Sequence, residues 1–313
     1  MHRPMPVFLH TTRRIRAPFF LVSALLLAAL AFSIPLAQAA TPTPSSVEDR
    51  YAVMNGARLH YTNQGTGPDA VVFLHGWSCD ASFWRAQAQA EAGSHRVLAL
   101  DLIGFGKSDA PHVEYTQDLL ADGVAAVLDQ AGVRRAVLVG HSMGLAVAKR
   151  FMERHPGRTA GLFIVDGAYV DLPKDAAQAE GFKLLIQNPV AKSPEGWRSF
   201  VTGFVKPMLA DSTPPEARAE VMTSMLNTPQ HVAQSSMLHF LEPGGWNNTV
   251  VNVPVHAVYA TSQLEGLTPR AFLSRVFPQL AYEQWNNTGH FIMFDQSGRL
   301  TAAIRSFVRQ VLR

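Results

Sequence analysis

The chain has 313 residues, of which 47% are hydrophobic and 16% charged, so it can bury one sizeable core and is not a disordered polymer. Basic residues outnumber acidic ones by 27 to 24, but four of the arginines lie within the first sixteen residues, where there is no acid. The rest, with 23 basic and 24 acidic residues, offers no clustered basic surface for a nucleic-acid partner. Cys79 is the only cysteine, which excludes an intramolecular disulfide and a metal–thiolate cluster.

Residues 1–39 have the pattern of a signal peptide. Three arginines within residues 13–16 form a positive start, residues 19–32 are almost unbroken apolar, and Ala-Gln-Ala at 37–39 offers small residues to a signal peptidase. The alternative is an uncleaved membrane anchor, because the apolar run 17–34 approaches the length that spans a bilayer. We expect a periplasmic or secreted protein, attached to the membrane only if this segment is retained.

Strands and helices are expected to alternate after a linker at 40–50, which is rich in Thr, Pro and Ser. Residues 51–62 alternate around Asn55-Gly56, which predicts a β-hairpin. Apolar runs rich in β-branched residues, typical of parallel strands, then predict strands at 70–74, 96–101, 136–140, 162–166, 255–260 and 280–285. Apolar residues at spacings of three and four predict helices at 82–91, 116–131, 143–155, 270–277 and 297–312.

Residues 167–252 interrupt this alternation. They contain no convincing strand, and Met, Phe and Trp are scattered among helix formers and prolines. We interpret them as a helical cap inserted between the two parts of a core, residues 51–166 and 253–313. The cap's methionines suggest an apolar pocket, although their adaptable side chains do not define its shape.

The segment Gly140-His141-Ser142-Met143-Gly144 lies directly between a predicted strand and a predicted helix. This is the context of a nucleophile elbow, in which the glycines allow a sharp turn that presents the serine at the end of the strand. A Gly-x-Ser-x-Gly match alone is weak, but the strand before it and the helix after it favour Ser142 as a nucleophile.

Four motifs follow one another along the chain: His75-Gly76-Trp77, residues 101–109 (DLIGFGKSD), the elbow at 140–144, and Gly289-His290-Phe291. In this order they resemble the α/β-hydrolase superfamily, over nearly the whole chain from residue 51 onward. The resemblance implies an α/β fold with a mostly parallel central sheet flanked by helices and an inserted helical cap. It also implies the lid-bearing branch with a serine nucleophile. One departure is Leu145, where many members carry a third glycine.

The resemblance also implies roles for individual residues. His290 is expected to be the general base, because a serine hydroxyl is a poor nucleophile until an imidazole takes its proton. The backbone N–H groups of Trp77 and Met143 are expected to form the oxyanion hole, a task that needs no particular side chain. We interpret His75 and His141 as structural residues that shape their loops.

The acid of the expected triad is missing from its usual place. Relatives carry an aspartate just after the strand predicted at 255–260, where this chain has Gln263, which has no charge. Asp166, at the end of the strand after the elbow helix, and Glu265 are the two candidates. Certain haloalkane dehalogenases carry the acid at the strand end that corresponds to Asp166. We favour Asp166 because a rigid strand end positions a carboxylate better than a loop does, while Glu265 and a dyad without an acid remain alternatives.

The predicted activity is therefore that of an exported serine hydrolase that cleaves a small, apolar carboxylic ester, thioester or lactone through an acyl-enzyme. No metal or organic cofactor is required. Two alternatives use the same triad, namely a cofactor-free perhydrolase or haloperoxidase and a carbon–carbon bond hydrolase. A third is a non-catalytic ligand-binding member of the fold. The missing acid favours this alternative, whereas the retained Ser142 and His290 argue against it.

Overall fold

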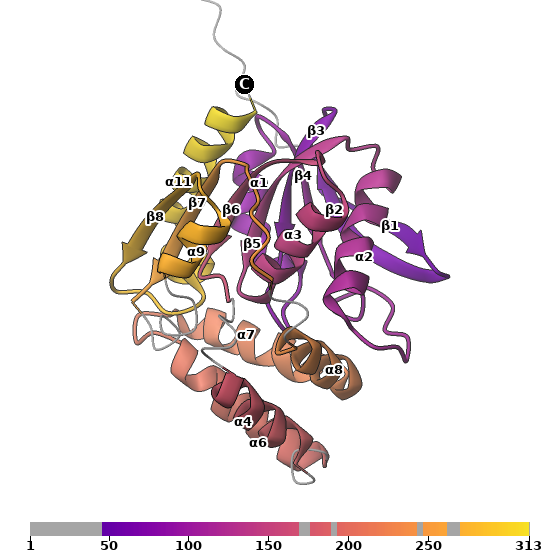
Figure 1. Cartoon of the computed structure of the whole chain (residues 1–313), viewed down its shortest axis with the longest axis vertical. Helices are drawn as coiled ribbons and strands as arrows, with labels where there is room; N and C mark the ends of the chain where they lie inside the picture. Colours follow the sequence, from indigo (N-terminus) through magenta and orange to yellow (C-terminus); the bar gives the residue numbers. More distant parts are fainter. Residues whose placement is uncertain (1–45, 169–175, 189–192, 243–246, 262–269, 313) are drawn as a thin grey trace, which may run out of the picture. The chain divides into compact units, whose positions relative to one another are not determined.

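The computed structural model describes residues 46–168, 176–188, 193–242, 247–261 and 270–312. Eight strands form one sheet in the order β1-β2-β4-β3-β5-β6-β7-β8 (Figure 1). All neighbours from β4 onward in this order are parallel, whereas β2 pairs antiparallel with both β1 and β4 and so runs opposite to the other strands. The strands are β1 Glu48–Met54, β2 Ala57–Gln64, β3 Asp69–Leu74, β4 Arg96–Leu100, β5 Arg135–His141, β6 Thr159–Val165, β7 Val255–Ala260 and β8 Leu280–Trp285.

The predicted hairpin is confirmed and forms one edge of the sheet. Asn55 and Gly56 both have positive φ, 52° and 85°, as a two-residue type I′ turn requires. The first strand begins at Glu48, three residues before the expected start of the core and inside the stretch we assigned to the linker. Glu48 pairs with Asn63, and this pairing uses backbone groups, so it needs no apolar side chain that composition could reveal.

The parallel strands are confirmed, and their burial explains their sequences. Residues 71–74 of β3 and 136–139 of β5 are completely buried, as expected of strands covered on both faces. β6 begins at Thr159 and not at the predicted residue 162, because its first residues pair with β5 although they are only partly buried. The predicted end of β6 moves by one residue, so that Asp166 lies just outside the strand.

Helices cover the sheet in two pairs. The helix α2 (Gln117–Gln130) packs on α3 (Met143–Arg154), and these contact β1 and β5, while α1 (Arg85–Glu91) packs on α11 (Ser297–Val311), and these contact β4 and β6 (Figure 1). A helix near 82–91 was expected, and it begins as the 3-10 turn η1 (Ala81–Trp84). The other predicted helices are confirmed to within one residue, including α9 (Arg270–Val276). The short α10 (Ile292–Asp295) was not predicted because four residues show no periodicity.

Helices alone are found between β6 and β7 among the described residues. They are α4 Ala176–Gln187, α6 Pro194–Val205, η2 Lys206–Met208, α7 Pro215–Asn227 and α8 Gln230–Phe240, and they lie beyond one end of the sheet (Figure 1). We call residues 176–240 the cap. The cap follows β6 in the chain, and Asp166 is the first residue after β6. The cap is therefore connected to the end of the sheet at which Asp166 lies.

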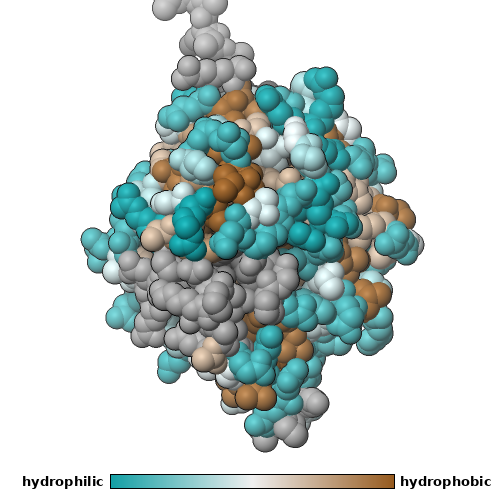
Figure 2. All heavy atoms as spheres, viewed as in Figure 1, coloured by the Kyte–Doolittle hydropathy of each residue, from teal (hydrophilic) through white to brown (hydrophobic). Residues whose placement is uncertain are grey.

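The surface is mixed in character. On the face in Figure 2, hydrophilic residues cover much of the described surface and apolar residues emerge in separate small groups. In the part of the chain that the structure describes, no helix is both long and apolar enough to cross a membrane. The predicted signal peptide, residues 1–39, lies outside the described residues.

Candidate active site

The structure brings Asp166 and His290 into direct contact. The Nδ1 atom of His290 lies 2.5 Å from Oδ2 of Asp166, and the two residues are only 3% and 4% exposed. The other carboxylate oxygen, Oδ1, accepts a hydrogen bond of 2.9 Å from the backbone N–H of Ala260 at the end of β7. Because each oxygen faces a donor, the carboxylate is held in one orientation, in which Oδ2 can accept a hydrogen bond from Nδ1–H of the imidazole.

The backbone of Asp166 is also held. Its N–H donates to the carbonyl oxygen of Val258 at 2.8 Å, and its φ is +42°, a value that Asp tolerates better than most residues. The next residue, Gly167, has no room for a side chain, since an added Cβ would lie 2.7 Å from Cδ2 of Leu145. Leu145, which stands where many members of the family have a third glycine, is fully buried there. Its larger side chain fits because Gly167 has no side chain of its own.

The loop that carries His290 is fixed at its backbone. Its N–H donates to the carbonyl oxygen of Met208 in the cap at 2.9 Å. Its own carbonyl oxygen lies 3.0 Å from Nε2 of His141, and the two imidazole rings are 4.5 Å apart. Burial lowers the pKa of His141 well below its ordinary value, so its ring is neutral and Nε2 carries the proton that it donates. This agrees with the structural role expected for His141.

Ser142 occupies a sharp turn between β5 and α3. Its φ of 49° and ψ of −121° are strained for a residue with a side chain, and strain of this kind clusters at functional sites. The turn is stabilised by hydrogen bonds from the backbone N–H groups of Leu145 and Ala168 to the carbonyl oxygen of Ser142, at 3.0 and 3.1 Å. A Cβ on Gly144 would lie 2.5 Å from the carbonyl oxygen of Leu74, so only glycine lets α3 begin this close to β3.

The loop after β3 closely approaches Ser142. A Cβ on Gly76 would lie 3.0 Å from Cβ of Ser142 and 2.9 Å from Nδ1 of His141, so this position also requires glycine. Among the described residues, no hydrogen bond uses the backbone N–H of Trp77 or of Met143. Both residues are buried, and Met143 is the first residue of α3.

The side chain of Trp77 connects this loop to the cap. Its Nε1–H donates to the carbonyl oxygen of Ala233 in α8 at 2.8 Å. Its ring meets the rings of Phe204 and Trp197 of α6 edge to face, with centroids 5.5 and 6.2 Å apart. Aromatic pairs in this arrangement contribute beyond their buried area, so Trp77 is a main anchor between the core and the cap.

A model of the alpha/beta hydrolase family matches residues 71–304. The chain belongs to this family. The eight-stranded, mostly parallel sheet flanked by helices is the alpha/beta hydrolase fold, as predicted, and hydrolases are prominent among the proteins that resemble the chain.

Three of these proteins illustrate the range of the alpha/beta hydrolase relatives. The 2-hydroxy-6-oxononadienedioate/2-hydroxy-6-oxononatrienedioate hydrolase of Burkholderia vietnamiensis is 39% identical over 140 residues, which cover 41% of this chain and 46% of that enzyme. The dihydrolipoyllysine-residue acetyltransferase component of the acetoin cleaving system of Cupriavidus necator is 32% identical over 133 residues, 42% of this chain and 36% of that protein. The chain therefore spans less than half the length of these two relatives. A thermophilic esterase from Thermogutta terrifontis shares the fold, with a TM-score of 0.70 and 23% identity over 85% of this chain and 99% of that one.

The remaining predicted site residues of this alpha/beta hydrolase have different outcomes. Glu265 and Gln263 lie outside the described residues, so the alternative acid stays a prediction. Cys79 is buried, and burial raises the pKa of its thiol well above the ordinary value, so it is not a thiolate nucleophile. In the described part of the chain, no group of three or more His, Cys, Asp or Glu side chains is arranged to hold a metal ion.

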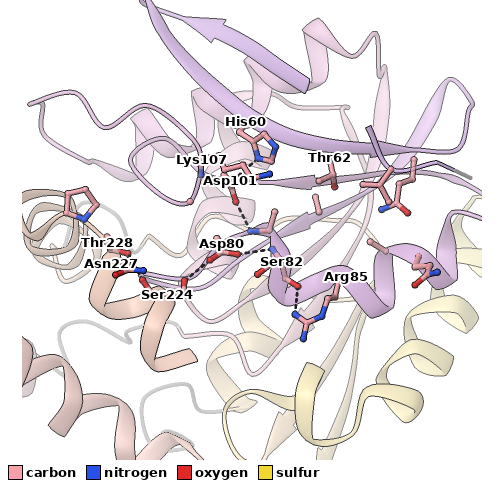
Figure 3. Close-up of a pocket in the computed structure, with 18 residues that line it drawn as sticks. His60, Thr62, Asp80, Ser82, Arg85, Asp101, Lys107, Ser224, Asn227 and Thr228 are labelled. Atoms are coloured by element: carbon pink, nitrogen blue, oxygen red, sulfur yellow. Dashed lines mark hydrogen bonds and ion pairs between the residues drawn. The ribbon is translucent and has the colours of Figure 1, made fainter. Parts of the chain in front are cut away.

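A cavity of about 550 Å³, lined by both polar and apolar residues, lies between the core and the cap (Figure 3). Residues from β2, η1, α1, the 101–109 turn and the end of α7 line it, and Ser142, Asp166 and His290 are not among them. No local pattern could have indicated it, because its walls come from segments far apart in the sequence.

At this cavity two carboxylates flank an imidazole, with His60 and Asp101 buried and Asp49 exposed. The imidazole of His60 lies between two carboxylates, with Nδ1 2.7 Å from Oδ2 of Asp101 and Nε2 2.6 Å from Oδ1 of Asp49. Asp101 also accepts hydrogen bonds from the backbone N–H groups of Ala81 and Lys107, at 2.7 and 2.8 Å. Asp101 is thus occupied in holding the turns around it.

Proposed function

We propose that the protein is a serine hydrolase that cleaves a carboxylic ester, thioester or lactone through an acyl-enzyme. The observation that carries the proposal is the buried contact between Asp166 and His290, next to the strained turn that presents Ser142. A carboxylate that holds Nδ1–H leaves Nε2 of the imidazole free to accept a proton, which is what a serine nucleophile requires.

In the proposed reaction these groups act as follows. Ser142 Oγ attacks the acyl carbon while Nε2 of His290 takes its proton, and Asp166 stabilises the imidazolium through the bond to Nδ1. The backbone N–H groups of Trp77 and Met143 donate to the developing oxyanion, and preorganised donors of this kind supply a large part of the rate enhancement. His290 then returns the proton to the leaving alcohol or thiol, and a water molecule activated by the same imidazole releases the acid.

Hydrolysis of p-nitrophenyl esters from acetate to decanoate tests the proposal, with Ser142→Ala as the control. We expect Ser142→Ala and His290→Ala to lower kcat by about 10⁴-fold or more, as removal of a triad member does elsewhere. Activity that Ser142→Ala leaves unchanged would show that the reaction does not pass through an acyl-enzyme on this residue. Mass spectrometry of the protein after a short reaction with a slow ester should detect the acyl adduct on the peptide that contains Ser142.

A carbon–carbon bond hydrolase is the second candidate. It is favoured by the 39% identity with the 2-hydroxy-6-oxononadienedioate/2-hydroxy-6-oxononatrienedioate hydrolase, which covers about half of that enzyme. Cleavage of a vinylogous diketone, followed by its absorbance, would distinguish this activity from ester hydrolysis. An assay for peracid formation would identify the cofactor-free perhydrolase.

We further propose that the protein is exported and that residues 1–39 are removed. The positive, apolar and small-residue regions of this segment support the proposal. The intact mass of the protein recovered from the periplasm or medium should correspond to a chain that begins at Ala40. A membrane-bound protein of full-length mass would favour the uncleaved anchor.

A further inference from the structure

The loop that carries His290 rests on a segment of the cap. We call residues 286–291 the base loop and residues 208–213, which connect η2 to α7, the cap turn. The His290 N–H bonds the carbonyl oxygen of Met208 at 2.9 Å, and a Cβ on Gly289 would lie 2.5 Å from the same oxygen. The Ser212 hydroxyl reaches the carbonyl oxygen of Asn287 at 3.5 Å. Glycine at position 289 thus allows the two segments to touch.

Asp295 connects the same two segments with its carboxylate. Oδ2 accepts a hydrogen bond of 2.6 Å from the backbone N–H of Gly289 and one of 3.2 Å from the hydroxyl of Thr288. Oδ1 accepts a hydrogen bond of 2.7 Å from the hydroxyl of Thr213 in the cap turn. Thr213 and Thr288 are only 3% and 7% exposed, so water does not compete freely for these bonds. Hydrogen bonds to an ionised carboxylate are roughly twice as strong as those between neutral groups.

The cap turn is itself held in shape, so it can serve as a support. The guanidinium of Arg218 in α7 donates to the carbonyl oxygens of Thr213, at 2.9 Å, and of Ala210. The backbone N–H of Thr213 also donates to the carbonyl oxygen of Ala210 at 3.0 Å. The hydroxyl of Thr213 therefore reaches Asp295 from a braced turn and not from a loose loop.

We propose that Asp295 and Thr213 are positioning residues for His290, through which the docked cap sets the place of the catalytic base. The inference rests on the proposed function of His290. Neither side chain bonds to Ser142, Asp166 or the imidazole. Asp295 holds the backbone N–H of Gly289, the residue before His290, and Thr213 fixes the carboxylate from the cap side. A base displaced by about 1 Å can lose a factor of about 10² in rate, so a small shift of this loop is enough to be measured.

Replacing Thr213 by valine and by serine separates positioning from packing. Valine keeps the shape of threonine and loses the hydroxyl, whereas serine keeps the hydroxyl and loses the methyl group. If Thr213 positions the base, Thr213→Val should lower kcat about tenfold with KM within about twofold, and Thr213→Ser should restore most of the loss. If the residue only packs, Thr213→Val should resemble the wild type and Thr213→Ser should be the more damaged protein.

The matched control is Ser235→Ala. Ser235 in α8 is another cap hydroxyl that bonds the core, accepting a hydrogen bond of 2.9 Å from the backbone N–H of Tyr115 and donating one of 3.0 Å to Glu114. Among the described residues, no hydrogen bond joins Ser235 to the base loop, the cap turn or Asp295. Its loss should lower stability by a similar amount and leave kcat unchanged. A double-mutant cycle of Thr213→Val with Asp295→Asn should show coupling, because the two act through one hydrogen bond.

A readout independent of the substrate completes the test. The rate at which a fluorophosphonate labels Ser142 reports activation of the serine by the base, and it should fall with kcat in Thr213→Val and recover in Thr213→Ser. Thr213→Val labelled as fast as the wild type, while Ser142→Ala and His290→Ala are inactive, would overturn the positioning role alone. If Ser142→Ala remains active, the proposed function itself has failed. These two failures are therefore distinguishable.

Discussion

Replacing Asp166 by asparagine tests the acid with almost no change in shape. Oδ1 of Asp166 accepts the Ala260 N–H at 2.9 Å, and Oδ2 lies 2.5 Å from Nδ1 of His290. An amide has one oxygen, and the Ala260 N–H can only donate, so the amide oxygen must face Ala260. The NH₂ group then faces Nδ1 of His290 and holds the ring proton on Nε2. In that tautomer the imidazole cannot take the proton of Ser142.

The magnitude follows from the role of the tautomer. In a serine-protease triad the corresponding change lowers kcat about 10⁴-fold, which is about 5.5 kcal/mol of transition-state stabilisation. We expect a loss of this order for Asp166→Asn. The φ of +42° at this position is tolerated by Asn as well as by Asp, so the backbone need not move.

The assay is hydrolysis of the best p-nitrophenyl ester by the purified variant, with a thermal melt to show that it is folded. Glu265→Gln is the matched control, since it removes the alternative carboxylate, and it should change kcat by less than about twofold. Asp166 does not orient the imidazole if Asp166→Asn retains more than a tenth of wild-type kcat. A larger loss in Glu265→Gln would reassign the acid to that residue.

Three further changes test the supports of the site by urea denaturation. Gly144→Ala should lose about 1–3 kcal/mol of stability, because its Cβ would lie 2.5 Å from the carbonyl oxygen of Leu74 and α3 must shift. Ser142→Gly should be about 1 kcal/mol more stable than Ser142→Ala, because relief of the strain at φ of 49° exceeds the entropy that glycine adds to the unfolded chain. Burial disfavours the charged form of His60. Its hydrogen bonds to carboxylates, of which the one to Asp101 has the largest effect, outweigh burial and raise the pKa of His60 above 6.5. The stabilisation is therefore largest below pH 6.5 and is lost as pH rises through the raised pKa, so the stability margin of the wild type over His60→Gln should shrink as the pH rises above 6.5.

The opposite result in any of the three stability measurements would contradict the corresponding prediction. A Gly144→Ala protein of wild-type stability would mean that α3 can move away from β3 at no cost. If Ser142→Gly is less stable than Ser142→Ala, the turn is not strained. A margin that stays constant with pH would show that the two carboxylates do not raise the pKa of His60.

Local sequence patterns predicted most of the fold. Asn55-Gly56 requires positive φ at both residues, and the buried strands require apolar runs, so each element could be recognised within a few residues. The elbow at Ser142 was predicted for the same reason, since the glycines that allow its turn are its sequence neighbours. The boundaries of β1 and β6 could not be predicted, because backbone pairing extends these strands over residues whose side chains carry no signal.

Only the tertiary structure decided which groups meet. Asp166 and His290 are 124 residues apart in the chain, and sequence order alone left Asp166, Glu265 and a dyad without an acid as alternatives. The link from Thr213 to Asp295 spans 82 residues and had no sequence signal at all. The physical reason is that an elbow is built from the backbone freedom of adjacent glycines, whereas a charge pair forms between whichever side chains the packing of strands and cap brings together. The sequence by itself thus determined the fold and pointed to Ser142 and His290, and the packing of β6, β7 and the cap determined what surrounds the base.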